Sequence, residues 1–165
     1  MLEMLENMAF PTWVRESPSI FAYTAILSLH AMGLATLVGL HTVVCLRLLG
    51  AMKSLPLVNV RKVYTVMYVG MWTNIFSGAC LLWANLTGML KSPAFLSKIA
   101  FVILGIIFMQ RMKNRVFSDA ALAVSQTPTA EARQLAWISL ICWTGAIISG
   151  RLSAYPGFFS MLFGN

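Results

Sequence analysis

The sequence predicts an all-α transmembrane protein, a bundle of four helices that cross a lipid bilayer. Of its 165 residues, 59% are hydrophobic and only 10% are charged, and the mean hydropathy of +0.78 is far above that of a soluble domain. The apolar residues form four runs, each long enough to span about 30 Å of hydrocarbon as a helix. No acidic residue occurs between Glu16 and Asp119. We expect a single domain, residues 1–165.

Three dipeptides indicate helix starts, because Ser or Thr caps the free amides of a first turn and proline suits the first helical position. They are Ser17-Pro18, Ser92-Pro93 and Thr127-Pro128. With the apolar runs, they predict membrane helices over residues 18–46, 63–88, 93–113 and about 134–155. Before them, MLEMLENMAFPTWVRE mixes apolar and acidic side chains, so we expect a short helix lying in the membrane interface.

Lysine and arginine predict the orientation, because they collect in cytoplasmic loops. The first loop holds Arg47, Lys53, Arg61 and Lys62, and the third holds Arg111, Lys113, Arg115 and Arg133. Both termini are therefore expected outside. Helical spans favour the bacterial inner membrane over an outer membrane of barrels. The net charge of +7 is split between loops, which predicts contact with anionic lipids and no nucleic-acid partner.

The lack of carboxylates within the membrane weighs against two classes of function. A proton-coupled carrier usually needs an ionisable carboxylate on its path. General acid and base catalysis usually needs a carboxylate or histidine beside a second polar group. The sequence contains no Ser-His-Asp arrangement, phosphate-binding glycine loop, HExxH or dinucleotide fingerprint. We predict no stand-alone catalytic site, and an enzymatic role only as the electron-transfer subunit of an oxidoreductase.

Both histidines of the chain, His30 and His41, lie in the first predicted span. Their separation turns a helix about 20° beyond three full turns and rises about 16 Å, so they share a face at different depths. We expect His30 about 18 Å from the outer end of the helix, near the middle of the bilayer. We expect His41 near the cytoplasmic boundary. One haem cannot use both, because its axial nitrogens lie about 4 Å apart.

Two interpretations of His30 are open. As a packing residue, a neutral His30 would hydrogen-bond a polar side chain of another helix. As an axial ligand, it would hold the iron of a b-type haem, with Gly33 one turn on leaving room for the flat ring. The polar neighbours expected at its depth are Asn74, Ser77, Cys142 and Trp143. The sixth ligand of such a haem would be Met71, Met109, a histidine of a second copy, or none.

Lys98 and Arg151 are both expected toward the outer side, near the start of the third span and the end of the fourth. With Arg15 they would form a cationic opening above His30. Such an opening would bind haem propionates, a quinone headgroup or another anion through charge-assisted hydrogen bonds. The alternative is that these long side chains extend to lipid headgroups.

His41 and Cys45 are four positions apart, which would let both reach one soft metal ion. A copper site would need a further ligand, such as Met67 or Met112, because two ligands do not make a site. The three cysteines form no CxxC pair, so burial within the packing is their expected role. A seam of small residues predicts a surface for close helix approach. It consists of Ala31, Ala35 and Gly39.

Four stretches carry a resemblance to a known family: WVRESPSIFAYTAILSLHAMGLATLVG, LRLLG, SPAFLSK and GRLSAY. In these stretches the chain resembles uncharacterised bacterial four-span inner-membrane proteins with a domain of unknown function. The resemblance covers most of the chain but implies no activity, cofactor or substrate, and His41 and Cys45 lie outside its pattern. The positions that it singles out are Arg15, His30, Gly33, Arg47, Lys98, Arg151 and Tyr155.

We therefore predict a small membrane subunit with an outward-opening polar site. It would bind a b-type haem or a quinone and pass electrons within a larger membrane complex, or as a homo-oligomer. The cofactor residues would be His30, Gly33, Lys98 and Arg151, with His30 on the haem iron. One alternative is a cofactor-free accessory subunit that packs against a partner complex. Another is a carrier that moves a small anion through the cationic opening.

Overall fold

The structure is a computed structural model, and it describes residues 2–116, 127–153 and 155. The described residues form helices and contain no strand. The helices are α1 (Leu2–Glu6), α2 (Ala9–Glu16), α3 (Tyr23–Leu49), α4 (Leu57–Ala84), α5 (Leu86–Lys91), α6 (Pro93–Val116) and α8 (Ala130–Leu152). Of these, α3, α4, α6 and α8 are long and apolar enough to cross a membrane. The predicted all-α fold with four spans is confirmed.

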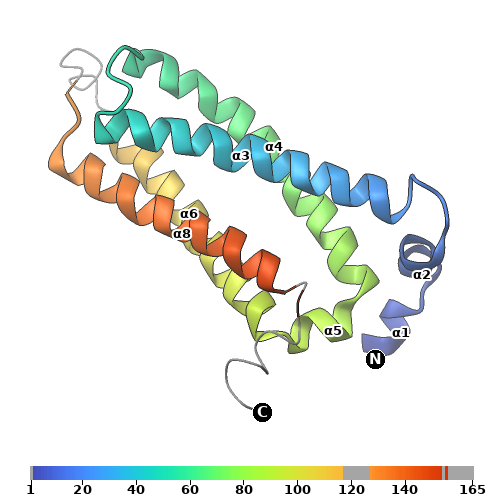
Figure 1. Cartoon of the computed structure of the whole chain (residues 1–165). Helices are drawn as coiled ribbons and strands as arrows, with labels where there is room; N and C mark the ends of the chain where they lie inside the picture. Colours follow the sequence, from blue (N-terminus) through green and yellow to red (C-terminus); the bar gives the residue numbers. More distant parts are fainter. Residues whose placement is uncertain (1, 117–126, 154, 156–165) are drawn as a thin grey trace.

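The four long helices are arranged as two antiparallel pairs, α3 with α4 and α6 with α8 (Figure 1). Backbone contacts between α3 and α8 join the pairs, whereas α4 and α6 have few backbone contacts and are linked by side chains such as Tyr68 and Lys113. The α3–α4 connection lies at the same end of the bundle as the carboxyl end of α6 and the start of α8. The short helices α1, α2 and α5 lie at the opposite end. We call these the loop end and the terminal end.

The apolar core lies toward the loop end, where α3, α4, α6 and α8 all contribute buried side chains. It is rich in sulfur, with Cys45, Met67, Met109 and Met112 fully buried. Flexible thioether side chains fill irregular gaps between helices well. Most side chains of α4 and α6 are not buried within the chain, as is expected of helices whose outer faces contact lipid.

Two of the predicted helix starts agree closely with the structure. Helix α6 begins at Pro93, and Ser92 Oγ accepts a hydrogen bond from the Phe95 amide at 3.4 Å. Helix α8 begins at Ala130, four residues before the predicted span. Its cap is Thr129, whose Oγ1 accepts from the Ala132 amide at 3.2 Å. The capping prediction therefore holds for Ser92, while Thr129 takes the place expected for Thr127.

Helix α3 begins at Tyr23, not at residue 18. The serines before it form turns: Ser17 Oγ accepts from the Ser19 amide at 3.2 Å, and Ser19 Oγ accepts from the Phe21 amide at 3.3 Å. His30 is consequently about 10 Å from the first residue of its helix, and not about 18 Å. The histidine is nearer the terminal end than predicted.

The predicted second span, 63–88, is displaced toward the amino terminus in the structure. Helix α4 starts after Pro56 and ends at Ala84, because Asn85 leaves the helical region with φ −144° and ψ 57°. The chain then turns into α5. The predicted interfacial segment is two short helices, and they pack on this junction. Trp83 Nε1 donates to the Leu5 carbonyl at 2.9 Å.

The seam of small residues does not mediate packing between the described helices. Ala31, Ala35 and Gly39 are all exposed, and no atom lies within 4 Å of a Cβ built on Gly39. The close approach occurs at Gly33 and Gly70 instead. A Cβ on Gly33 would lie 2.7 Å from the Asn74 amide nitrogen. The prediction chose the wrong face of α3, because several faces of this helix carry small residues.

Candidate functional site

His30 is half-buried on α3 and faces α4. Its Nδ1 lies 3.0 Å from the Asn74 carbonyl oxygen and 3.2 Å from Ser77 Oγ. Ser77 donates its own hydroxyl proton to the Thr73 carbonyl at 2.6 Å, so its oxygen is free to accept. A carbonyl oxygen only accepts hydrogen bonds, so the proton of a neutral His30 ring belongs on Nδ1. Nε2 then carries an unprotonated lone pair.

Two residues of α4 hold this ring in place. Asn74 Nδ2 donates to the His30 carbonyl at 2.8 Å, so the two residues are joined by reciprocal hydrogen bonds. Gly78 lies against the ring, and a Cβ there would stand 2.9 Å from His30 Cε1. The predicted neighbours Asn74 and Ser77 are therefore correct. Gly78 was missed, because nothing in the sequence shows which glycine of α4 faces α3.

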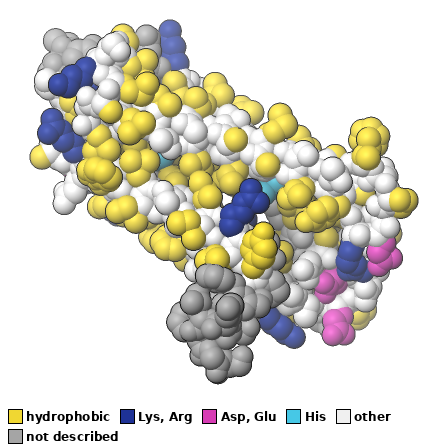
Figure 2. Space-filling view, viewed as in Figure 1, with side chains coloured by type: hydrophobic (Ala, Val, Ile, Leu, Met, Phe, Trp, Pro, Cys, Tyr) yellow, Lys and Arg dark blue, Asp and Glu magenta, His cyan; other side chains and the backbone are white. Residues whose placement is uncertain are grey.

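Lys98 of α6 is the charged neighbour of His30, close enough for its charge to act on the ring. The lysine is half-buried, and its stem crosses α8 at Gly150, where Lys98 Cδ would lie 3.3 Å from a built Cβ. No carboxylate of the described residues forms an ion pair with Lys98. Figure 2, viewed as in Figure 1, shows a lysine or arginine side chain beside a histidine near the middle of the molecule. The charge of a lysine on α6 therefore acts on the imidazole of α3.

The two predicted arginines of the opening differ in their surroundings. Arg151 follows Gly150 in the last turn of α8 and is exposed. Arg15 instead donates to the Ala84 carbonyl at 3.3 Å and pairs with Glu16 at 3.1 Å. Arg15 thus fixes α2 to the carboxyl end of α4, and the structure gives it no contact with the ring of His30.

Gly33 does not have the surroundings expected of it. The backbone of α4 occupies the space beside Gly33, with the Gly70 carbonyl 2.9 Å and the Asn74 amide 2.7 Å from a built Cβ. No flat ring fits between these two backbones. Gly33 is a point of close approach between α3 and α4, one turn from His30, whose ring is bonded to Asn74 of α4.

Arg47 and Tyr155, which the resemblance also singles out, differ in burial. Arg47 is buried at the loop end, where its Nε donates to the Leu55 carbonyl. It therefore contributes to the α3–α4 connection as well as to the loop charge. Tyr155 is exposed after α8.

His41 lies in the core and is fully buried. Its Nε2 is 2.7 Å from Ser139 Oγ and 3.4 Å from Cys45 Sγ, and the Trp143 ring packs nearby, with ring centroids 6.2 Å apart. Sequence reasoning placed Trp143 near His30 and missed Ser139. Ser139 and Trp143 are one turn apart on α8 and so lie on the same face of that helix. This spacing identifies them as neighbours of His41 only once α8 is known to face His41.

The structure tests the copper interpretation only in part. Met67 and Met112 are buried in the same core as His41 and Cys45. Within the described residues, no three side chains of the His, Cys, Asp and Glu types meet at a common point. His41 Nε2 is bonded to Ser139, whereas its Nδ1 is buried without a hydrogen-bond partner among the described residues. The bond to Ser139 supports a packing role for this histidine.

The arrangement around His30 is suited to holding an iron atom or a polar cofactor group. Histidines that ligate metals commonly donate their second ring N–H to a backbone carbonyl, which fixes the tautomer and raises the basicity of the ligand nitrogen. His30 has this bond to Asn74. Lys98 offers a cation for a carboxylate or a carbonyl oxygen. Met71 and Met109, the two methionines predicted as a sixth ligand of the haem, are buried in the apolar core.

Comparison of the chain with family models, with curated proteins and with solved structures gave no significant match. The resemblance of its motifs to a family of four-span membrane proteins therefore stays a prediction. The fold and the geometry around His30 are the grounds on which a function can be argued.

Proposed function

We propose that this protein is a small subunit of a bacterial inner-membrane assembly, with both termini outside, that binds a b-type haem through His30 and passes electrons. One observation carries the proposal. The hydrogen bond from His30 Nδ1 to the Asn74 carbonyl directs the lone pair of Nε2 away from α4, ready to ligate iron. The haem would supply reversible one-electron transfer.

Lys98 supports the same proposal from the opposite helix pair. A half-buried cation without a described carboxylate partner is unfavourable in a membrane unless an anion joins it. A haem propionate is such an anion, and the ammonium would bind it through a charge-assisted hydrogen bond. Arg151, exposed beside Gly150, would extend the cationic opening toward the surface. The partner complex or second copy would complete the coordination of the iron.

A cofactor-free accessory role is the second candidate, and a specific observation favours it. The reciprocal bonds between His30 and Asn74 join α3 to α4 whether or not a cofactor is present. Polar contacts of this kind contribute about 0.6 to 2 kcal/mol to helix association in membranes. Quinone binding is the third candidate function. In that case His30 Nε2 would accept a hydrogen bond from a quinol hydroxyl, and Lys98 would donate one to a quinone oxygen.

The test is a reduced-minus-oxidised visible spectrum of protein purified in mild detergent, with a pyridine haemochrome assay. His30→Gln and the matched control His41→Gln are measured beside the wild type. We expect a b-type spectrum that His30→Gln abolishes and that His41→Gln retains, because Nε2 of His30 lies in a half-open site, whereas the unbonded Nδ1 of His41 is fully buried in the core. Lys98→Gln should lower the haem content without abolishing it.

The other outcomes separate the candidates. Folded wild-type protein without haem, but with a quinone in its organic extract that His30→Gln loses, would replace haem by quinone. Folded protein that holds neither would favour the accessory role. A haem spectrum unchanged by His30→Gln would overturn the assignment of the ligand.

A further inference from the structure

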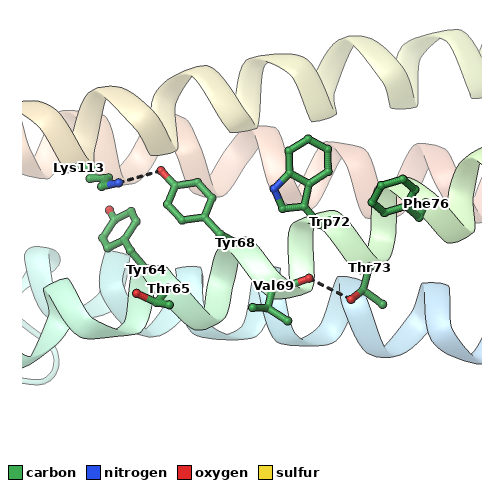
Figure 3. A pocket seen from close by; sticks show the side chains of 8 residues that line it. All are labelled: Tyr64, Thr65, Tyr68, Val69, Trp72, Thr73, Phe76 and Lys113. Atoms are coloured by element: carbon green, nitrogen blue, oxygen red, sulfur yellow. Dashed lines mark hydrogen bonds between the residues drawn. The ribbon is translucent and has the colours of Figure 1, made fainter.

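A second site lies on the opposite side of α4 from the α3 contact. A groove of about 660 Å³ runs along α4 beside the loop-end half of α6 (Figure 3). Its lining includes Tyr64, Tyr68, Val69, Trp72 and Phe76 of α4, with Lys113 of α6. The groove exists because the backbones of α4 and α6 stay apart, so that side chains alone bridge the space between them.

The groove has a polar end at the loop end of the bundle. Lys113 Nζ donates to the Tyr68 hydroxyl at 3.3 Å and lies 4.7 Å from the centroid of the Tyr68 ring. The Tyr68 hydroxyl in turn donates to Gln110 Oε1 at 2.6 Å. No described carboxylate forms an ion pair with Lys113. A cation held by a phenol, with its charge not neutralised, is suited to binding an anion.

Apart from Thr65 and Thr73, the rest of the groove is apolar, and it matches one leaflet in length. Val69, Trp72 and Phe76 expose 63%, 53% and 67% of their surface. The rise along α4 from Tyr64 to Phe76 is about 18 Å, and the hydrocarbon of one leaflet is about 15 Å deep. The two rings at the far end, Trp72 and Phe76, lie 5.9 Å apart and form a continuous apolar wall.

From these features we propose that the groove binds one anionic glycerophospholipid of the leaflet at the loop end. The phosphate would contact Lys113 and the Tyr68 hydroxyl, and an acyl chain would lie along Val69, Trp72 and Phe76. Charge complementarity selects this occupant: the polar end offers a cation and a hydroxyl, while the wall carries no charge and its Thr73 hydroxyl is already bonded to the Val69 carbonyl. Lys113 is held on Tyr68 and half-buried, unlike a lysine that simply extends to the headgroups. The proposal is independent of the haem proposed at His30.

The test is native mass spectrometry of delipidated protein titrated with phosphatidylglycerol or phosphatidylcholine. We expect one phosphatidylglycerol to bind the wild type more tightly than phosphatidylcholine does. Lys113→Gln should weaken phosphatidylglycerol about fivefold, as is typical of one cation at a lipid surface, and should remove the preference. The control Lys62→Gln makes the same change at an exposed position near the start of α4, outside the groove lining, and should leave both affinities unchanged.

A second variant tests the apolar part. Val69→Trp should fill the groove and weaken both lipids equally, while thermal unfolding shows that the protein stays folded. Equal affinity of the wild type for the two lipids would overturn the proposal, as would equal effects of Lys113→Gln and Lys62→Gln. If the purified protein retained a quinone in this groove, and Lys113→Gln lost it, the choice of a phospholipid as occupant would be overturned.

Discussion

His30 and His41 occupy nearly the same face of one helix, yet their surroundings are opposite. His41 is fully buried, and its Nε2 is bonded to Ser139 at 2.7 Å. His30 is half-buried, and no described residue is bonded to its Nε2. The unbonded nitrogen of His41, Nδ1, is enclosed in the core, whereas the unbonded Nε2 of His30 lies in a half-open site that feels the charge of Lys98.

The difference follows from position along the bundle. At the loop end, α3, α4, α6 and α8 enclose a common core around His41. Toward the terminal end, α3 and α8 separate (Figure 1), and the described hydrogen bonds of the His30 ring all go to α4. The two residues have the same side chain. Their different surroundings therefore follow from how many helices enclose each of them.

The largest effect is expected from breaking the close approach that supports His30. Gly33→Ala should lower the free energy of unfolding by about 2 to 3 kcal/mol, because its methyl group would meet the backbone of α4. Gly39→Ala is the matched control. It should be neutral or gain up to about 1 kcal/mol, because its surroundings are open. Denaturant unfolding in detergent measures both, and equal values would contradict the α3–α4 contact.

An intermediate effect is expected from removing each histidine. His41→Ala should cost about 2 kcal/mol, since it leaves a cavity in a closed core and removes a hydrogen bond. His30→Ala should cost about 1 kcal/mol, because the site is half-open and leaves less of a cavity. The same unfolding measurement compares them. A larger loss for His30 would mean that the terminal end is packed as tightly as the core.

The smallest effects are expected from removing the single serine hydroxyl groups that contact the two histidines. Ser139→Ala should cost about 1 kcal/mol, because it removes the oxygen bonded to His41 Nε2. Ser77→Ala should cost about half as much, because His30 Nδ1 keeps the Asn74 carbonyl. A double-mutant cycle of Ser139 with His41 should give a coupling near 1 kcal/mol. Zero coupling would show that the bond contributes nothing.

Much of the site followed from the sequence, and the misses share one cause. Asn74 and Ser77 were predicted as partners of His30, because polar residues are rare in apolar helices and depth alone brings them together. Ser139 and Gly78 were missed, and the role of Gly33 was wrong, because depth says nothing about rotation. In a helix that is apolar all round, no hydrophobic stripe shows which face meets a neighbour.

The sequence by itself determined the all-α architecture and the four spans. Lipid offers the backbone no hydrogen-bond partners, so long apolar runs must satisfy their own amides as helices. Only the tertiary structure decided which histidine is enclosed in the core and which lies in a half-open site, which glycine lets α4 approach, and where a groove stays open. These depend on the rotation and separation of helices, which packing sets and which composition leaves undetermined.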